Sequence, residues 1–297
     1  MLIKNFIIYN WRYIPLSFNK DSFNKKLIIY IVTIIFICTI FSGCSSIDSL
    51  RVKLGFKNND FEYIKQNKIK KIVIQSTRDP GFRFVVTDQS AISELYDILS
   101  SAKQVKQKST LDADYVFEMD EGQGTVHKFK YVAGIDKSDS GNLYSDDKIY
   151  IVSKRIDNDI INNFWDIRKP KNFQDVYYNS MIRTVNQYFQ NKDKTKTIGI
   201  NLKDDVDIAK FLLSTDLVDF KDTLISDYKN IDLVSDDKDK YEILVTIKTQ
   251  GYKSTLYKGI VTFWDKDKQT EDKYYILDKY VTGGWNIEIT NDKPTDF

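Results

Sequence analysis

The fold class is set by three consecutive segments: Ile69-Lys70-Lys71-Ile72-Val73-Ile74-Gln75-Ser76, then Arg78-Asp79-Pro80-Gly81, then Phe82-Arg83-Phe84-Val85-Val86-Thr87. The first and last segments are rich in β-branched and aromatic residues, which favour strands. The middle segment is a turn signal, because proline presets φ and glycine adopts positive φ. The three segments together therefore predict a β-hairpin.

A helix is predicted after the hairpin, because Thr87 or Asp88 can cap it and apolar residues then recur at spacings of three and four. A polar loop, three strands and a short closing helix are expected next, over Lys103–Asp112, Asp114–Met119, Thr125–Val132, Lys148–Ser153 and Asn158–Trp165. This order predicts an α+β domain over residues 68–166, in which helices cover one face of an antiparallel sheet.

Several features of this first unit carry a family resemblance. They are Ile72-Val73-Ile74, the Asp79-Pro80-Gly81 turn, the Thr87-Asp88 helix start, and Gly141-Asn142-Leu143-Tyr144 ahead of Tyr150-Ile151-Val152-Ser153. Through them the segment resembles the YhfM-like domain of bacterial lipoproteins of the Bacillus and Clostridium type. The resemblance implies a small extracytoplasmic domain on a lipid anchor. It implies no activity and no site residue.

A second unit is expected over residues 173–297, after a linker in which Pro170 blocks helix continuation. The spacing of apolar residues predicts a helix over Phe173–Gln190. The further elements are a short strand, two helices and four strands, expected over Thr197–Leu202, Val206–Leu213, Leu217–Tyr228, Tyr241–Gln250, Tyr252–Asp265, Lys273–Thr282 and Trp285–Ile289, with Gln250-Gly251 as a turn. We predict a curved antiparallel sheet around a helix, similar to cystatin-like or NTF2-like folds.

An export signal is predicted within residues 1–43. Lys20, Lys25 and Lys26 form a basic stretch, and the fifteen residues Leu27–Phe41 that follow carry no charge. A helix of that length reaches about 22 Å, whereas the hydrocarbon core of a bilayer measures about 30 Å. A basic region, a short apolar region and small residues in this order are typical of a signal peptide.

Phe41-Ser42-Gly43-Cys44 resembles the lipobox of bacterial lipoproteins, with Phe41 where leucine is usual. The resemblance implies signal cleavage after Gly43 and palmitate-type lipid attachment to the Cys44 thiol, which would anchor the protein stably in the membrane. Residues 44–67 are then a tether. The alternative is an uncleaved signal-anchor helix, which also places the folded part outside the cytoplasm. Because Met1–Asn24 is unusually long for the segment before the basic pair, we expect the true start codon to lie downstream, near Asp21 to Lys25.

The composition argues against several classes of function. Hydrophobic residues make up 42% and charged residues 29%, which suffices for a folded core. A formal net charge of +2 does not indicate the strongly basic surface that binds nucleic acid. Two cysteines and one histidine are too few for a structural zinc site or a disulfide scaffold. No nucleophile-elbow or Walker motif occurs. We therefore expect no cofactor, no metal and no catalytic residue. The abundance of Lys, Asn, Ile, Tyr and Asp favours a Gram-positive source.

Three groups of side chains are the remaining candidates for chemistry. His127 has no second histidine or free thiol to work with, which favours a surface strand position. Aromatic residues concentrate in the second unit, where most are expected in the core and the rest to line a cavity for a small apolar ligand, peptide or glycan. Acidic residues cluster at Asp112/Asp114, Asp120/Glu121, Asp204/Asp205/Asp207, Asp236/Asp237/Asp239 and Asp265/Asp267, where the pattern favours solvated turns over Ca²⁺ sites.

The sequence therefore predicts a lipid-anchored protein on the extracytoplasmic face of the cell membrane, serving as a binding or assembly module without catalysis. Its partners are the membrane and an unknown envelope protein or small ligand, and not nucleic acid. Two alternatives are a surface hydrolase that uses carboxylates and a ligand-scavenging lipoprotein. Two acidic side chains with raised pKa in one deep pocket would favour the hydrolase.

Overall fold

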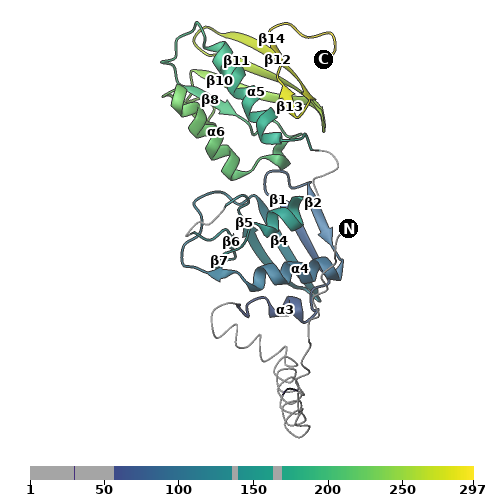
Figure 1. The fold of residues 1–297 in the computed structure, drawn as a ribbon. Helices are drawn as coiled ribbons and strands as arrows, with labels where there is room; N and C mark the ends of the chain where they lie inside the picture. The colour runs from purple at the N-terminus through teal and green to yellow at the C-terminus, as the bar shows by residue number, and fades with distance from the viewer. Residues whose placement is uncertain (1–29, 31–56, 136–139, 163–168) are drawn as a thin grey trace, which may run out of the picture. The chain divides into compact units, whose positions relative to one another are not determined.

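The computed structural model describes residues 30, 57–135, 140–162 and 169–297. Residues Lys57–Phe297 form one compact unit that contains two seven-stranded sheets together with helices (Figure 1). The predicted α+β class is confirmed. The signal peptide, its cleavage position at Gly43 and the lipid attachment residue Cys44 lie outside the described residues, as does most of the predicted tether.

The first sheet has the strand order β2-β1-β4-β5-β6-β7-β3, and each neighbouring pair is antiparallel. In chain order its strands are β1 (Lys71–Ser76), β2 (Arg83–Val86), β3 (Lys103–Gln104), β4 (Tyr115–Gly122), β5 (Thr125–Tyr131), β6 (Leu143–Tyr144) and β7 (Ile149–Ile151). Burial alternates along β1 and β4, so one face of the sheet is turned to the core. The predicted hairpin is formed by β1 and β2.

Helix α4 (Gln89–Ser100) carries the apolar stripe that the sequence predicts, and Figure 1 shows it across one face of the first sheet. Its buried residues include Ile92, Leu95 and Leu99. Asp88 caps the helix, because its Oδ1 accepts hydrogen bonds from the Ser90 and Ala91 amides at 3.0 and 2.9 Å. A short helix, α3 (Glu62–Lys65), precedes the sheet and contacts α4.

Two predictions for the first unit need correction. The polar loop over Lys103–Asp112 begins with β3, which extends the sheet by pairing with β7. The closing helix begins at Ile156 rather than Asn158 and is a π-helix over Ile156–Ile161, with residues 163–168 outside the described part. Neither feature has a local sequence signal. Strand β3, for example, has two residues, which is too short to show an alternating pattern.

The second sheet has the strand order β13-β12-β11-β10-β8-β9, and β14 also pairs with β12. Its strands are β8 (Ile198–Asn201), β9 (Ile231–Leu233), β10 (Ile243–Lys253), β11 (Leu256–Asp265), β12 (Thr270–Val281), β13 (Gly284–Asn286) and β14 (Ile289–Thr290). Helix α5 (Phe173–Tyr188) contacts β11 and β12. Its apolar stripe buries Val176, Tyr177, Met181 and Val185 against the inner face, as its spacing predicts.

The second sheet is mixed, because β8 is parallel both to β10 and to β9. A parallel pair needs a crossover connection, usually a helix, and helix α6 (Ser214–Asp227) supplies it between β8 and β9. The four residues of β8 are all buried, as is typical of a central parallel strand.

Two further boundaries differ from the sequence predictions. The Gln250-Gly251 pair is not a turn: β10 continues through it to Lys253 with a bulge between Thr249 and Gly251, and the turn lies at residues 254–255. Glycine inside a strand often marks a bulge. The helix expected over Val206–Leu213 is reduced to a 3₁₀ turn, Ala209–Phe211, because Leu212 is already extended at its end.

Within the described ranges, none of the helices combines the length and apolar character needed to cross a membrane.

A buried carboxyl group ties α5 to the second sheet. Asp278 is fully buried in β12; its Oδ2 lies 2.6 Å from the Ser180 hydroxyl, and its Oδ1 accepts a hydrogen bond from the Glu288 amide. The Ser180 hydroxyl also contacts the Val176 carbonyl. One hydroxyl has one proton, so both contacts are satisfied together when protonated Asp278 donates to Ser180. Burial raises the pKa of Asp278 to about 7.

Substitution of Asp88 by alanine should lower the thermal midpoint by a few degrees, because two amides at the start of α4 lose their acceptor. Thermal unfolding followed by circular dichroism measures the shift. Asp97→Ala on the exposed face of the same helix is the control. Equal midpoints for the two variants would contradict the capping role.

Substitution of Asp278 by asparagine should remove a pH dependence of stability. Because the folded pKa of about 7 lies above the ordinary 3.8, this carboxyl favours folding fully below about pH 4, and that contribution is lost as the pH rises to about 7. The free energy of unfolding of Asp278→Asn, measured relative to that of the native chain, should therefore rise by on the order of 2–4 kcal/mol from pH 4 to pH 8.

Urea unfolding at both pH values measures this gain, with the exposed Asp292→Asn variant as the control. A constant difference between Asp278→Asn and the native chain across the range would show that Asp278 titrates normally.

Candidate ligand-binding site

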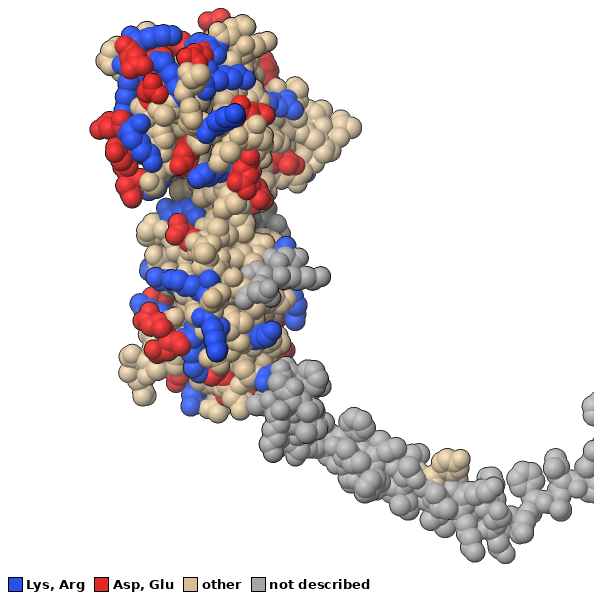
Figure 2. Space-filling view, turned by 90° about the vertical axis from the view of Figure 1, so that its left-hand side faces the viewer, with Lys and Arg blue, Asp and Glu red and all other residues tan. Residues whose placement is uncertain are grey.

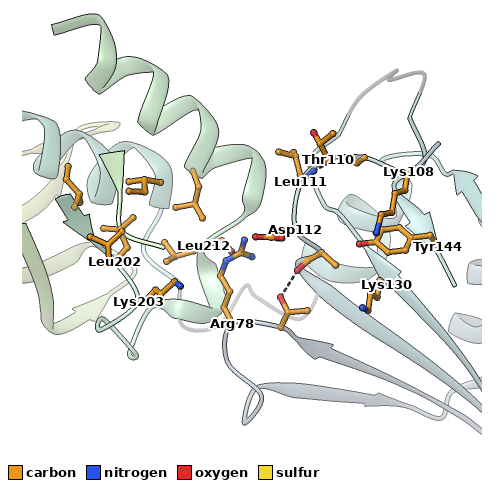
Figure 3. Close-up of a pocket in the computed structure, with 17 residues that line it drawn as sticks. Arg78, Lys108, Thr110, Leu111, Asp112, Lys130, Tyr144, Leu202, Lys203 and Leu212 are labelled. Atoms are coloured by element: carbon orange, nitrogen blue, oxygen red, sulfur yellow. Dashed lines mark hydrogen bonds between the residues drawn. The ribbon is translucent and has the colours of Figure 1, made fainter. Parts of the chain in front are cut away.

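A large cavity of about 830 Å³ in Lys57–Phe297 is bordered by both sheets (Figure 3). Lys130 of β5 and Tyr144 of β6 line it from the first sheet, whereas Ile200 of β8 and Leu233 of β9 line it from the second. Leu217 of α6 completes the apolar wall. Its volume lies in the range of small-molecule sites.

One end of the cavity is cationic. Lys108, Lys130 and Tyr144 lie near one another there (Figure 3). The Lys108 Nζ is 5.2 Å from the centre of the Tyr144 ring, a cation–π distance. Lys130 is placed beside Tyr144 by the pairing of β5 with β6. Burial, together with the charges of Asp112 and Asp114, raises the pKa of Tyr144, so its hydroxyl is a neutral donor.

The opposite end of the cavity is apolar. This end is lined by six aliphatic side chains, those of Ile200, Leu202, Leu212, Leu217, Leu233 and Val234. Lys203 is at the edge of this end and pairs with the exposed Asp236 at 3.2 Å. The cavity therefore offers charged groups to one part of a ligand and hydrocarbon to the other.

The middle of the cavity is fixed by a buried ion pair. Arg78 Nη1 donates to Asp114 Oδ1 at 2.5 Å, and Asp114 has only 1% of its side chain exposed. Asp114 also accepts hydrogen bonds from the Ala133 and Ser214 amides, each at 2.8 Å. Arg78 donates further to the Leu212 carbonyl and the Ser214 hydroxyl. Arg78 thereby connects the hairpin to the start of α6.

Burial raises the pKa of Asp114, although Arg78 and the amides of Ala133 and Ser214 act in the opposite direction. Desolvation of this ion pair is therefore costly, and the carboxylate oxygens need hydrogen-bond donors to offset that cost. We call Asp114 with its partners Arg78, Ala133 and Ser214 the lock, because these contacts stabilise the fold. Asp114 is not a free acid of the site, since it does not line the cavity.

His127 is held by its own neighbours. Its ring stacks on Tyr63 with 3.9 Å between centroids, and its Nε2 lies 2.7 Å from Glu121 Oε1. No group of three His, Cys, Asp or Glu side chains in the described ranges is arranged to hold a metal ion.

The acidic clusters separate into paired and buried groups. Asp120, Asp204, Asp236, Asp239, Asp265 and Asp267 each lie within 4 Å of a lysine ammonium. Asp205 is buried, and it accepts hydrogen bonds from the Thr249 amide and hydroxyl and from Tyr177. Of the clustered acids, Asp112 alone lines the large cavity, so the clusters do not converge on one site.

The aromatic side chains of the second unit pack into its core. Tyr188 stacks on Phe263 at 3.9 Å with an angle of 5° between the rings, and Tyr177 and Tyr257 are fully buried. The cavity of about 830 Å³ lies at the border of both sheets, with Tyr144 of the first sheet as the aromatic residue among its described lining.

Sequence reasoning missed Arg78, Lys108, Lys130 and Tyr144 as residues of a site. Arg78 stands in a turn signal, and Lys130 alternates with apolar residues in a strand, so each has a sufficient local explanation. Their meeting depends on pairing between distant segments, which the local pattern does not encode.

The charged side chains on the face seen in Figure 2 are of both signs and interspersed over the described residues. This distribution agrees with the nearly balanced composition.

The model of the YhfM protein family matches residues 65–170, which include the whole first sheet. The chain thus contains a YhfM-like domain, and the resemblance inferred from the sequence is confirmed for this segment. No curated protein and no solved structure is significantly similar to the chain.

Substitution of Arg78 by methionine should lower the free energy of unfolding by about 3 kcal/mol, because it leaves the Asp114 carboxyl buried without its cation. Chemical denaturation measures the loss. The control is Arg155→Met, which breaks the exposed pair with Asp159 and should leave stability nearly unchanged. Similar stabilities of the two variants would refute the lock.

Proposed function

We propose that the protein is a binding module without catalysis, held on the extracytoplasmic face of the cell membrane by a lipid on Cys44. The observation that carries the location is Phe41-Ser42-Gly43-Cys44, at the end of an uncharged segment that begins after Lys25 and Lys26. A thiol preceded by small residues suits both lipid transfer and cleavage after Gly43. Two or more acyl chains anchor a protein stably.

The large cavity supports a binding role for the folded part. Its lining combines apolar side chains with polar and charged groups from separate segments, as a ligand site needs for affinity and specificity. It also favours binding over assembly with an envelope protein, because a concave surface suits a small molecule.

The distribution of carboxyl groups favours binding over hydrolysis. Asp112 is the single acidic side chain among the described residues that line the large cavity. Carboxyl groups with raised pKa lie elsewhere in the fold; Asp205 and Asp278, for example, are buried and bonded to neighbouring residues. A pair of carboxylates arranged around a substrate, as in glycoside hydrolysis, is therefore not part of this cavity.

Cells that express the native chain should incorporate labelled palmitate into the protein and retain it in the membrane fraction. The Cys44→Ser variant should take up no label, because a hydroxyl does not replace the thiol as acceptor. Cys38→Ser, within the apolar segment, is the matched control and should label normally. A native chain without label, or one found in the cytosol, would refute the proposed location.

A further inference from the structure

We propose that the large cavity binds an amphipathic anion, with a single carboxylate or phosphate head at Lys108 and Lys130 and an apolar chain at the leucine-lined end. This inference rests on the proposed binding function and specifies the chemistry of its ligand. It follows from the contrast between the residues at the two ends of one cavity (Figure 3).

The cationic end holds ammonium groups that the described structure leaves without an acid. In the described ranges neither Lys108 nor Lys130 forms an ion pair, although Lys128, two residues earlier in β5, pairs with Glu118 at 2.7 Å. The Tyr144 hydroxyl likewise has no hydrogen-bond acceptor among the described residues. Two ammonium groups and a neutral hydroxyl donor together suit an oxyanion.

The other charged groups of the lining are already engaged. Arg78 is paired with Asp114 and Lys203 with Asp236. Asp112 is the one carboxylate of the lining and opposes an anion, but two uncommitted lysines outweigh it. A ligand with a cationic head would face both lysines at short range, so the balance of charge selects for an anion.

The apolar end accounts for the rest of the ligand. Leu217 and Leu233 are half-buried, so part of their hydrocarbon surface faces the cavity. A free inorganic anion would leave this surface wet, whereas a hydrocarbon chain would cover it. A head of one charge on a single chain therefore uses both ends. Fatty acids and phosphate esters of long-chain alcohols share this chemistry.

The test uses the full chain in nanodiscs of phosphatidylcholine, with decanoate and decyl phosphate as probes. Decyltrimethylammonium and inorganic phosphate are the comparison compounds. Saturation-transfer NMR measures affinity, and hydrogen exchange locates binding. Both anionic amphiphiles should bind and slow exchange near Leu111, Tyr144 and Leu217, whereas both comparison compounds should bind at least about tenfold more weakly. Whichever anionic probe binds more tightly identifies the head group.

Variants separate the two ends of the cavity. The double variant Lys108→Gln/Lys130→Gln should weaken decanoate binding about tenfold or more, because it removes both charge-assisted contacts. Lys128→Gln on the same strand and face is the matched control and should change affinity less than about twofold. Hydrogen exchange of the unliganded double variant should match that of the native chain, which checks that it folds.

The inference would be overturned by absence of anionic probe binding, by equal affinity for decyltrimethylammonium, or by unchanged affinity in the double variant. Equal binding of inorganic and decyl phosphate would also overturn it, by removing any role for the chain. These outcomes are independent of palmitate labelling. Loss of the label with retained probe binding would refute the membrane anchor alone, whereas a labelled chain that ignores the probes would refute the ligand chemistry alone.

Discussion

The carboxylate of Asp114 is the constraint on which the arrangement of the folded part depends. It accepts hydrogen bonds from Arg78 and from the amides of Ala133 and Ser214, which come from three separate regions of the chain. A buried carboxylate tolerates little misplacement, because each lost partner leaves a desolvated charge. The start of α6 and the end of the β1–β2 hairpin are consequently held in register with the first sheet.

The hydrogen bonds of Arg78 to Asp114 and Leu212 also fix the middle of the cavity. Arg78 and Leu212 line it and are joined to each other by a hydrogen bond, while Asp112 lies two residues before Asp114. A site assembled in this way has Lys130 on strand β5 and Leu217 and Leu233 on the opposite wall. Arg78 and Leu212 are already fixed by their mutual hydrogen bond, and such preorganisation lowers the entropic cost of binding.

The features that the sequence predicts well are those with local causes. The Asp79-Pro80-Gly81 turn, the Asp88 cap and the apolar stripe of Phe173–Tyr188 each have a signal within a few residues. The features it misses depend on distant partners. Asp114 is indistinguishable from a solvated acid until Arg78 and Ser214 are placed around it, and Gly251 resembles a turn residue although β11 pairs across it.

The parallel strand β8 has a consequence for the order of folding. Gly199 lies under the Tyr241 ring, where an added Cβ would come within 2.3 Å of the ring, and β8 pairs with residues 243–246. During synthesis, β8 emerges well before its sheet neighbours β9 and β10 have been made. Closing such a long loop is slow compared with forming the hairpins that follow. We therefore expect the meander of β10 to β12 to form first and β8 to pair with β10 afterwards.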